Sequence, residues 1–257
     1  MKISLDGRRA LITGGSKGLG LAMARQFIES GARVAIVARG HDALDAAVAT
    51  LPPGTAFPVA ADISTAAGCE AAFRAAEAAM GGVDILVNNA GTSQRGPFAE
   101  LSDAQWQADL DLKLFAAVRL SRFCWPGMQE RGWGRIINVL NIGAKAPLPT
   151  SAPTSVSRAA GMALTKVLAG EGAPHGILVN ALLVGIIESD QWTRRHAADP
   201  RGITWDEWKA EQGSAIPLGR LGRPEEFAAV ATLLASDAGG YVSGTAINVD
   251  GGRSPVV

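Results

Sequence analysis

The feature that most constrains this chain is a short apolar run, Arg9–Thr13, that leads directly into a glycine-rich loop and then a helical pattern. Glycines in such a loop let the backbone turn tightly and approach a diphosphate, and the following helix offers free N–H groups and the positive end of its dipole. A plain tight turn would not need three glycines at this spacing, so the strand, loop and helix together predict a dinucleotide site. The loop residues expected to contact the dinucleotide are Gly14, Ser16, Lys17, Gly18, Leu19 and Gly20.

Apolar runs alternate with longer helical patterns along the rest of the chain. Most of the runs are continuously hydrophobic, which is typical of parallel strands buried on both faces. The alternation predicts an α/β fold, a doubly wound parallel seven-stranded (Rossmann) sheet, in a single domain over residues 1–257. The longest predicted helix opens at a capping box formed by Ser102 and Gln105. The predicted strands are Arg9–Thr13, Arg33–Ala38, Ala56–Ala61, Asp84–Asn88, Arg135–Leu140, Ile177–Leu183 and Thr245–Asp250.

Composition excludes several classes of protein. The 257 residues contain 24 Lys and Arg against 24 Asp and Glu, so the charge balance gives no reason to expect a nucleic-acid or membrane partner. No apolar run approaches the ~20 residues of a membrane-spanning helix. The two cysteines, Cys69 and Cys124, lack ligand spacing, so no metal site and no disulfide scaffold are expected. The polar start of the chain does not resemble a signal peptide, and a cytoplasmic location is expected.

The segment 186–214 breaks the alternation, because it contains no clear strand but holds three of the six tryptophans. An insertion of this length is typically a functional lid, and tryptophans argue against disorder. We expect a substrate lid; the alternative is a helical flap over hydrophobic core. Arg194 and Arg195 would suit an anionic substrate and His196 could reach it, although six acidic residues in the segment argue against a net basic lid.

The end of the second predicted strand indicates which dinucleotide binds. An NAD site of this kind usually has an acidic residue there to hold the ribose 2′-hydroxyl. Here Ala38 takes that position, Arg39 follows it, and Lys17 lies in the glycine-rich loop. Two cations and no carboxylate favour the 2′-phosphate of NADP, whereas the alternative is that both are solvated surface charges.

Several motifs together make the whole chain similar to the short-chain dehydrogenase/reductase family. Thr13–Gly20 resembles its TGxxxGxG loop, 88–91 its NNAG motif, 180–185 its NAxxPG stretch with Val184 in place of proline, and 248–252 its last strand. The resemblance implies a carbonyl or alcohol substrate, and a homotetramer assembled through the helices at 102–131 and 151–173. The further cofactor contacts that it implies are Asp62, Ile63, Asn89, Ala90, Gly91, Arg158, Gly185, Ile187 and Ser189.

The catalytic set departs from that family, which generally uses Asn, Ser, Tyr and Lys. The one tyrosine, Tyr241, lies just before the last predicted strand, and the family positions hold Lys113, Asn141, Thr154 and Arg158. An alkyl hydroxyl is a far weaker acid than a phenol, so Thr154 alone cannot supply the proton. We expect Thr154 more readily to be a buried hydroxyl satisfied by the backbone than a catalytic group.

The other three residues offer partial replacements. Asn141 can donate a hydrogen bond to a carbonyl oxygen, and Arg158 can bind a ribose, phosphate or carboxylate but cannot relay protons. Lys113, if desolvated, would have a lowered pKa and act as an acid or a Schiff-base nucleophile; the alternative is a solvated helix lysine. Three functions therefore stay open: an NADP-dependent oxidoreductase, a non-redox lyase, or a catalytically silent NADP-binding protein.

Overall fold

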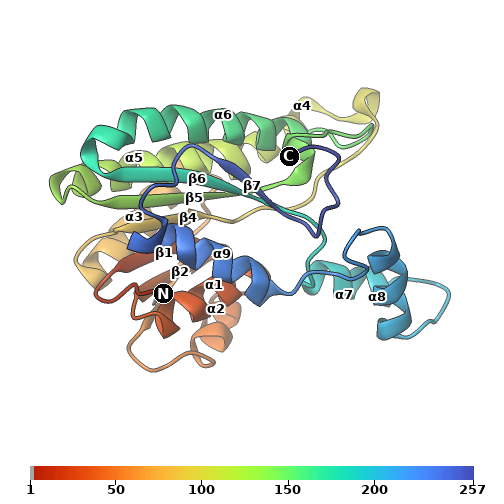
Figure 1. Cartoon of the computed structure of the whole chain (residues 1–257), viewed down its shortest axis with the longest axis horizontal. Coiled ribbons are helices and arrows are strands. Elements are labelled where there is room, and N and C mark those ends of the chain that lie inside the picture. The colour runs from red at the N-terminus through yellow and green to blue at the C-terminus, as the bar shows by residue number, and fades with distance from the viewer. Residues whose placement is uncertain (1–2) are drawn as a thin grey trace.

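The computed structural model describes residues 3–257, apart from the side chains of Asp190 and Gln191, and confirms the predicted sheet. Seven parallel strands are hydrogen-bonded in the order β3-β2-β1-β4-β5-β6-β7 (Figure 1). Each predicted strand is present, with ends that differ by at most a few residues. The strands are β1 Arg9–Thr13, β2 Arg33–Ala38, β3 Ala56–Ala60, β4 Ile85–Asn88, β5 Gly134–Asn141, β6 Ile177–Val184 and β7 Ala246–Val249.

Helices cover both faces of the sheet, with α1, α2 and α9 on one face and α3, α5 and α6 on the other (Figure 1). The helices are α1 Gly18–Glu29, α2 His41–Val48, α3 Ala66–Met80, α4 Asp103–Leu110, α5 Ala116–Glu130, α6 Thr154–Gly172, α7 Asp190–Ala197, α8 Trp205–Ser214 and α9 Pro224–Ala235. Single 3₁₀ turns lie at Phe98–Glu100, Ile142–Ala144, Ala173–His175 and Asp237–Gly239.

Alternating side chains of the central strands build a core on each face. Ile12 of β1 packs into the cluster that includes Phe27 of α1, whereas its neighbour Leu11 packs into the cluster that includes Phe73 of α3 and Leu120 of α5. Successive strand residues point to opposite faces, so a strand covered by helices on both sides must be hydrophobic throughout. This explains the continuous apolar runs in the sequence and fixes the strand ends that carry the site.

The long helix predicted over 102–131 is interrupted by a π-helical turn. Its capping box is confirmed, since the Ser102 hydroxyl accepts from the Gln105 amide and the Gln105 side chain accepts from the Ser102 amide. Between α4 and α5, Asp111–Phe115 forms the π turn, and Lys113 in this turn is buried. Such turns often occur at functional sites, because they shift a side chain relative to the helical pattern.

The segment 186–214, which we call the lid segment, forms two helices, α7 and α8, that stand out from the body (Figure 1). Its small core is shared with the residues that follow it: Trp208 is buried with Ile216 and Leu221 and packs beside Trp192 and Trp205. This packing explains the tryptophans. No helix within residues 3–257 combines the length and the hydrophobicity that crossing a membrane requires.

Candidate active site

A cavity of about 880 Å³ lies at the carboxyl ends of the strands. Its wall includes the glycine-rich loop, residues 89–93, the end of β5, the start of α6 and part of α7. The strand order reverses between β1 and β4, and open parallel sheets bind ligands in the crevice outside such a reversal. The cavity is therefore at the place where the fold is expected to bind a ligand.

The glycine-rich loop has the geometry of a diphosphate cradle. Gly14 and Gly18 have φ angles of +64° and +51°, which disfavour other residues, and a Cβ on Gly20 would lie 2.1 Å from the Gly14 carbonyl oxygen. Lys17 occupies the N-cap of α1, and its side chain makes no capping hydrogen bond to the first turn. The amide groups of that turn therefore carry no side-chain cap, and free N–H groups at a helix N-terminus suit a dinucleotide diphosphate.

Hydrogen bonds fasten this loop to the NNAG motif across the strand reversal. The Asn89 amide nitrogen Nδ2 donates to the carbonyl oxygens of Thr13 (2.9 Å) and Gly14 (3.2 Å). In return, the Thr13 hydroxyl accepts from the backbone N–H groups of Asn89 and Ala90. These bonds fix the glycine-rich loop against the NNAG motif at the cavity wall, although the two are 75 residues apart in the sequence.

The remaining residues of the predicted cofactor site divide into two groups. Gly185, Ile187 and Ser189 line the cavity beside the glycine-rich loop. Arg39 and Asp62, at the ends of β2 and β3, lie outside its wall, as do Ser16 and the buried Ile63. Hydrogen bonds from Ser64 lower the pKa of Asp62, and the positive charge of Arg39 lowers it further, so Arg39 and Asp62 are electrostatic neighbours.

Of the four residues predicted at the family's catalytic positions, Asn141, Thr154 and Arg158 line the cavity, whereas Lys113 does not. The Lys113 side chain is fully buried and forms an ion pair with Asp109, one helical turn earlier. Asp109 also accepts a hydrogen bond of 2.6 Å from the Ser157 hydroxyl. Burial lowers the pKa of Lys113 to about 8, and Asp109 opposes this by favouring the charged form. A solvated helix lysine is thus excluded.

Thr154 separates Lys113 from the cavity. The Lys113 ammonium donates to the Thr154 hydroxyl over 2.7 Å, and the Gln94 amide donates to the same oxygen over 3.1 Å. The hydroxyl itself donates to the Gln94 carbonyl oxygen over 2.7 Å. Thr154 is therefore satisfied by the backbone, as expected from the sequence, but it also joins a buried lysine to the cavity wall.

Arg158 and Asn141 also line the cavity. The Arg158 guanidinium donates to the Val139 carbonyl oxygen over 2.9 Å and approaches Gly91 so closely that a Cβ there would lie 2.4 Å from it. Burial lowers the pKa of Arg158 to about 10, so it stays charged at neutral pH. Asn141 lines the cavity, and its side-chain oxygen is buried without a hydrogen-bond partner among the described residues.

The sequence analysis missed three residues of this site: Asp109, Gln94 and Ser155. Asp109 precedes Lys113 by four residues, a spacing that places both on one helical face and could have revealed it. Ser155 is buried, lines the cavity and lies near Asn141, since a Cβ on Gly143 would be 2.7 Å from its hydroxyl and 3.2 Å from the Asn141 oxygen. Gln94 acts through its backbone, and no residue pattern marks such a contact.

His196 has a structural place in the lid segment. Its ring is hydrogen-bonded to the Ile203 carbonyl oxygen (2.8 Å) and packs edge-on against Trp205 and Trp208. It is not among the residues that line the cavity, whereas Arg194 and Arg195 are. His196 therefore supports α7 and α8 rather than reaching a substrate.

Relatives with known activity match nearly the whole chain. Acetoacetyl-CoA reductase of Shinella zoogloeoides is 33% identical over 246 residues, covering 96% of this chain and 98% of the relative. L-Sorbose reductase of Gluconobacter frateurii, solved with NADPH and L-sorbose, is 36% identical, covers 100% of both chains and superimposes with a TM-score of 0.95. Both are oxidoreductases.

A third relative bears on the substituted catalytic positions. A short chain oxidoreductase of Pseudomonas aeruginosa PAO1 that contains an atypical catalytic center, solved with NADPH, is 37% identical, covers 99% of both chains and has a TM-score of 0.91. Residues 14–254 match the family described as enoyl-(acyl carrier protein) reductase, one of the short-chain reductases. With its sheet, its glycine-rich loop and its NNAG motif, the chain belongs to the short-chain dehydrogenase/reductase family.

Proposed function

We propose that this protein is an NADP(H)-dependent oxidoreductase that interconverts a carbonyl and an alcohol, and that Lys113 supplies the proton through Thr154. The observation that carries this proposal is the 2.7 Å contact between the Lys113 ammonium and the Thr154 hydroxyl at the cavity wall. This contact connects the Lys113 ammonium, which can exchange protons near neutral pH, with the Thr154 hydroxyl, which a substrate in the cavity can reach.

Three features support NADP over NAD. Ala38 ends β2 without a carboxylate, Arg39 follows it, and Lys17 stands at the N-terminus of α1. Guanidinium and ammonium groups favour a 2′-phosphate, whereas a carboxylate there would repel it. The family alone does not decide, since two relatives were solved with NADPH and a 3-ketoacyl-(acyl-carrier-protein) reductase of Brucella melitensis with NADH. When bound, the cofactor supplies or accepts the hydride.

In the direction of reduction, the Thr154 hydroxyl gives its proton to the substrate oxygen as the Lys113 ammonium gives a proton to the Thr154 oxygen. Thr154 ends with its proton restored, and Lys113 ends as the neutral amine, to be reprotonated from solvent. The hydroxyl points to the Gln94 carbonyl in this structure, so donation requires it to turn about its Cβ–Oγ bond. Because its pKa is lowered, Lys113 gives up a proton near neutral pH more readily than an exposed lysine does.

Asn141, Ser155 and Arg158 orient the reactants. Asn141 and Ser155 line the wall side by side, and the Asn141 NH₂ group and the Ser155 hydroxyl are the groups that would donate to a carbonyl oxygen. Arg158, held between Val139 and Gly91, is placed to bind the nicotinamide ribose.

NADPH consumption with a panel of ketones, β-keto esters, ketoses and keto acids tests the proposed function. We expect at least one class to be reduced, with NADPH preferred to NADH and one NADPH consumed for each alcohol formed. No consumption with any member would reject the oxidoreductase. Borohydride trapping of an imine on Lys113 would instead favour the lyase, which needs the amine to enter the cavity past Thr154.

A further inference from the structure

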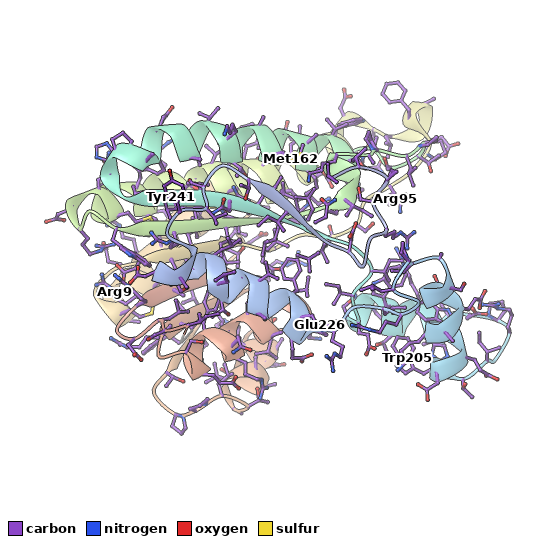
Figure 2. The ribbon with its side chains drawn as sticks, viewed as in Figure 1. Arg9, Arg95, Met162, Trp205, Glu226 and Tyr241 are labelled. Carbon is purple, nitrogen blue, oxygen red and sulfur yellow. The ribbon has the colours of Figure 1, made fainter. Side chains whose placement is uncertain are left out.

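Besides Arg158, four further arginines line the cavity. Arg95 follows β4, Arg194 and Arg195 belong to α7, and Arg253 follows β7. No acidic side chain lines this wall among the residues whose side chains the structure describes. Figure 2 shows Arg95 at the same end of the molecule as Trp205 of the lid segment. Three separate segments thus direct positive charge to one space.

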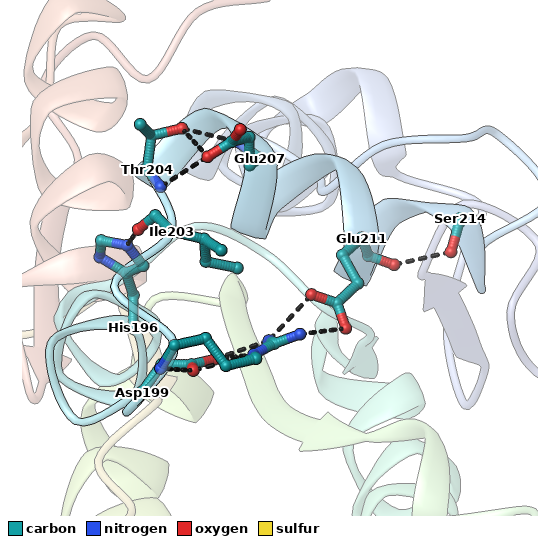
Figure 3. Close-up of polar contacts among 8 residues, drawn as sticks. His196, Asp199, Ile203, Thr204, Glu207, Glu211 and Ser214 are labelled. Carbon is teal, nitrogen blue, oxygen red and sulfur yellow. Dashed lines mark hydrogen bonds and ion pairs between the residues drawn. The ribbon is translucent and has the colours of Figure 1, made fainter.

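The acidic residues of the lid segment whose side chains the structure describes do not neutralise these arginines. The sequence contains six acidic residues between 186 and 214, and the five whose side chains are described bind other partners, as Figure 3 shows for Asp199, Glu207 and Glu211. Asp199 and Glu211 pair with Arg201, Glu188 and Asp206 pair with Lys209, and Glu207 completes the capping box with Thr204 at the start of α8. The segment holds six acidic residues against four Lys and Arg, but the described carboxylates pair with cations or backbone groups away from the cavity arginines.

The cavity arginines have a different environment. None of the four forms an ion pair with a carboxylate whose position is described. The Arg195 guanidinium lies 4.5 Å from the ring centre of Trp192, which also lines the cavity, so stacking holds it at the wall. Guanidinium groups collected in a concave site without carboxylates are suited to bind an anion.

We propose that the substrate carries a carboxylate or phosphate group, remote from the reacting carbonyl, that binds to Arg194, Arg195, Arg253 and Arg95. This inference rests on the proposed oxidoreductase function and names the class of its substrate. Planar guanidinium forks match carboxylate and phosphate oxygens in pairs, and the positive wall raises the local concentration of anions. Binding also draws the lid segment towards the body, because two of the four arginines lie on α7.

Matched pairs of carbonyl compounds test the anion site. Acetoacetate is compared with methyl acetoacetate, and dihydroxyacetone phosphate with dihydroxyacetone, so that the two pairs distinguish a carboxylate from a phosphate. We expect the anionic member of at least one pair to have a kcat/KM roughly ten-fold or more above its neutral partner, with an advantage that shrinks as salt is added. Arg194→Gln combined with Arg253→Gln should remove most of it.

Arg74→Gln is the matched control, because Arg74 is exposed on α3, pairs with Glu77 and does not line the cavity. Calorimetric binding of 3-hydroxybutyrate and of its methyl ester to the NADP-saturated protein provides a readout that needs no turnover. Anion binding without reduction of any carbonyl would keep the anion site and reject the oxidoreductase. Three results would overturn the inference. They are equal kcat/KM values for both members of each pair, no binding of any anionic member, and an anion preference that survives the double variant.

Discussion

The substitution Lys113→Met separates the structural from the chemical role of the buried lysine. It removes the ammonium and leaves the Asp109 carboxylate, whose side chain is 1% exposed, without its cation. Removing one partner of a buried ion pair costs about 3–5 kcal/mol, because the other charge stays desolvated. We therefore expect the free energy of unfolding to fall by ~3–5 kcal/mol, measured by urea denaturation at neutral pH.

Asp109→Asn combined with Lys113→Met provides the comparison. The buried charge is now removed from both positions, and Asn can still accept the hydrogen bond from Ser157. Replacing a whole buried pair by neutral groups is often close to neutral in stability, so the double variant should regain at least half of the loss. Its rate of NADPH oxidation should nevertheless stay ~10²–10⁴-fold below that of the unmodified protein, as expected when general acid catalysis is lost.

Both measurements can refute this reasoning. If Lys113→Met unfolds at the same urea concentration as the unmodified protein, the buried ion pair does not stabilise the fold as described. If the double variant recovers stability and also reduces substrate at the original rate, Lys113 is not the source of the proton.

Four further predictions follow from the site and the fold. Because burial lowers the pKa of Lys113 to about 8 and its ammonium supplies the proton, kcat for reduction should fall as pH rises through about 8, and a pH profile that is flat to pH 10 would contradict this. Arg39→Ala should weaken NADP binding ~10–100-fold in calorimetry, as expected for one lost charge-assisted contact, and leave NAD binding unchanged. Hydrogen exchange in the lid segment should slow when cofactor and substrate bind, and equal protection in both states would count against a lid. Light scattering should give about four times 26.5 kDa, in keeping with the exposed Val156 and Val167 on α6, and a monomer would refute the tetramer.

The sheet and the glycine-rich loop were predictable because their physics is local. A strand buried on both faces must be hydrophobic throughout, so the residue types of Arg9–Thr13 predict a strand. A loop that approaches a diphosphate must contain glycine, so the glycines of Gly14–Gly20 predict the loop. The same reasoning located the strand ends, and with them the place of the cavity.

The catalytic site was only partly predictable, because it depends on contacts between distant segments. The π turn at Asp111–Phe115 directs Lys113 into the interior, and nothing in the residue pattern marks that turn. Thr154 acquires its proposed role from a lysine that is 41 residues away in sequence, and its other partner is a backbone carbonyl. The four arginines of the proposed anion site belong to three separate segments, so their common wall emerges only in three dimensions.

The central claim, that Lys113 acts through the Thr154 hydroxyl, is tested most directly by comparing Thr154→Ser with Thr154→Ala in stopped-flow NADPH oxidation. Serine keeps the hydroxyl that contacts Lys113 over 2.7 Å, whereas alanine removes it and leaves the ammonium without a route to the cavity. We expect the serine variant to stay within about ten-fold of the unmodified rate and the alanine variant to lose ~10²–10⁴-fold. Equal rates for the alanine and serine variants would contradict the account.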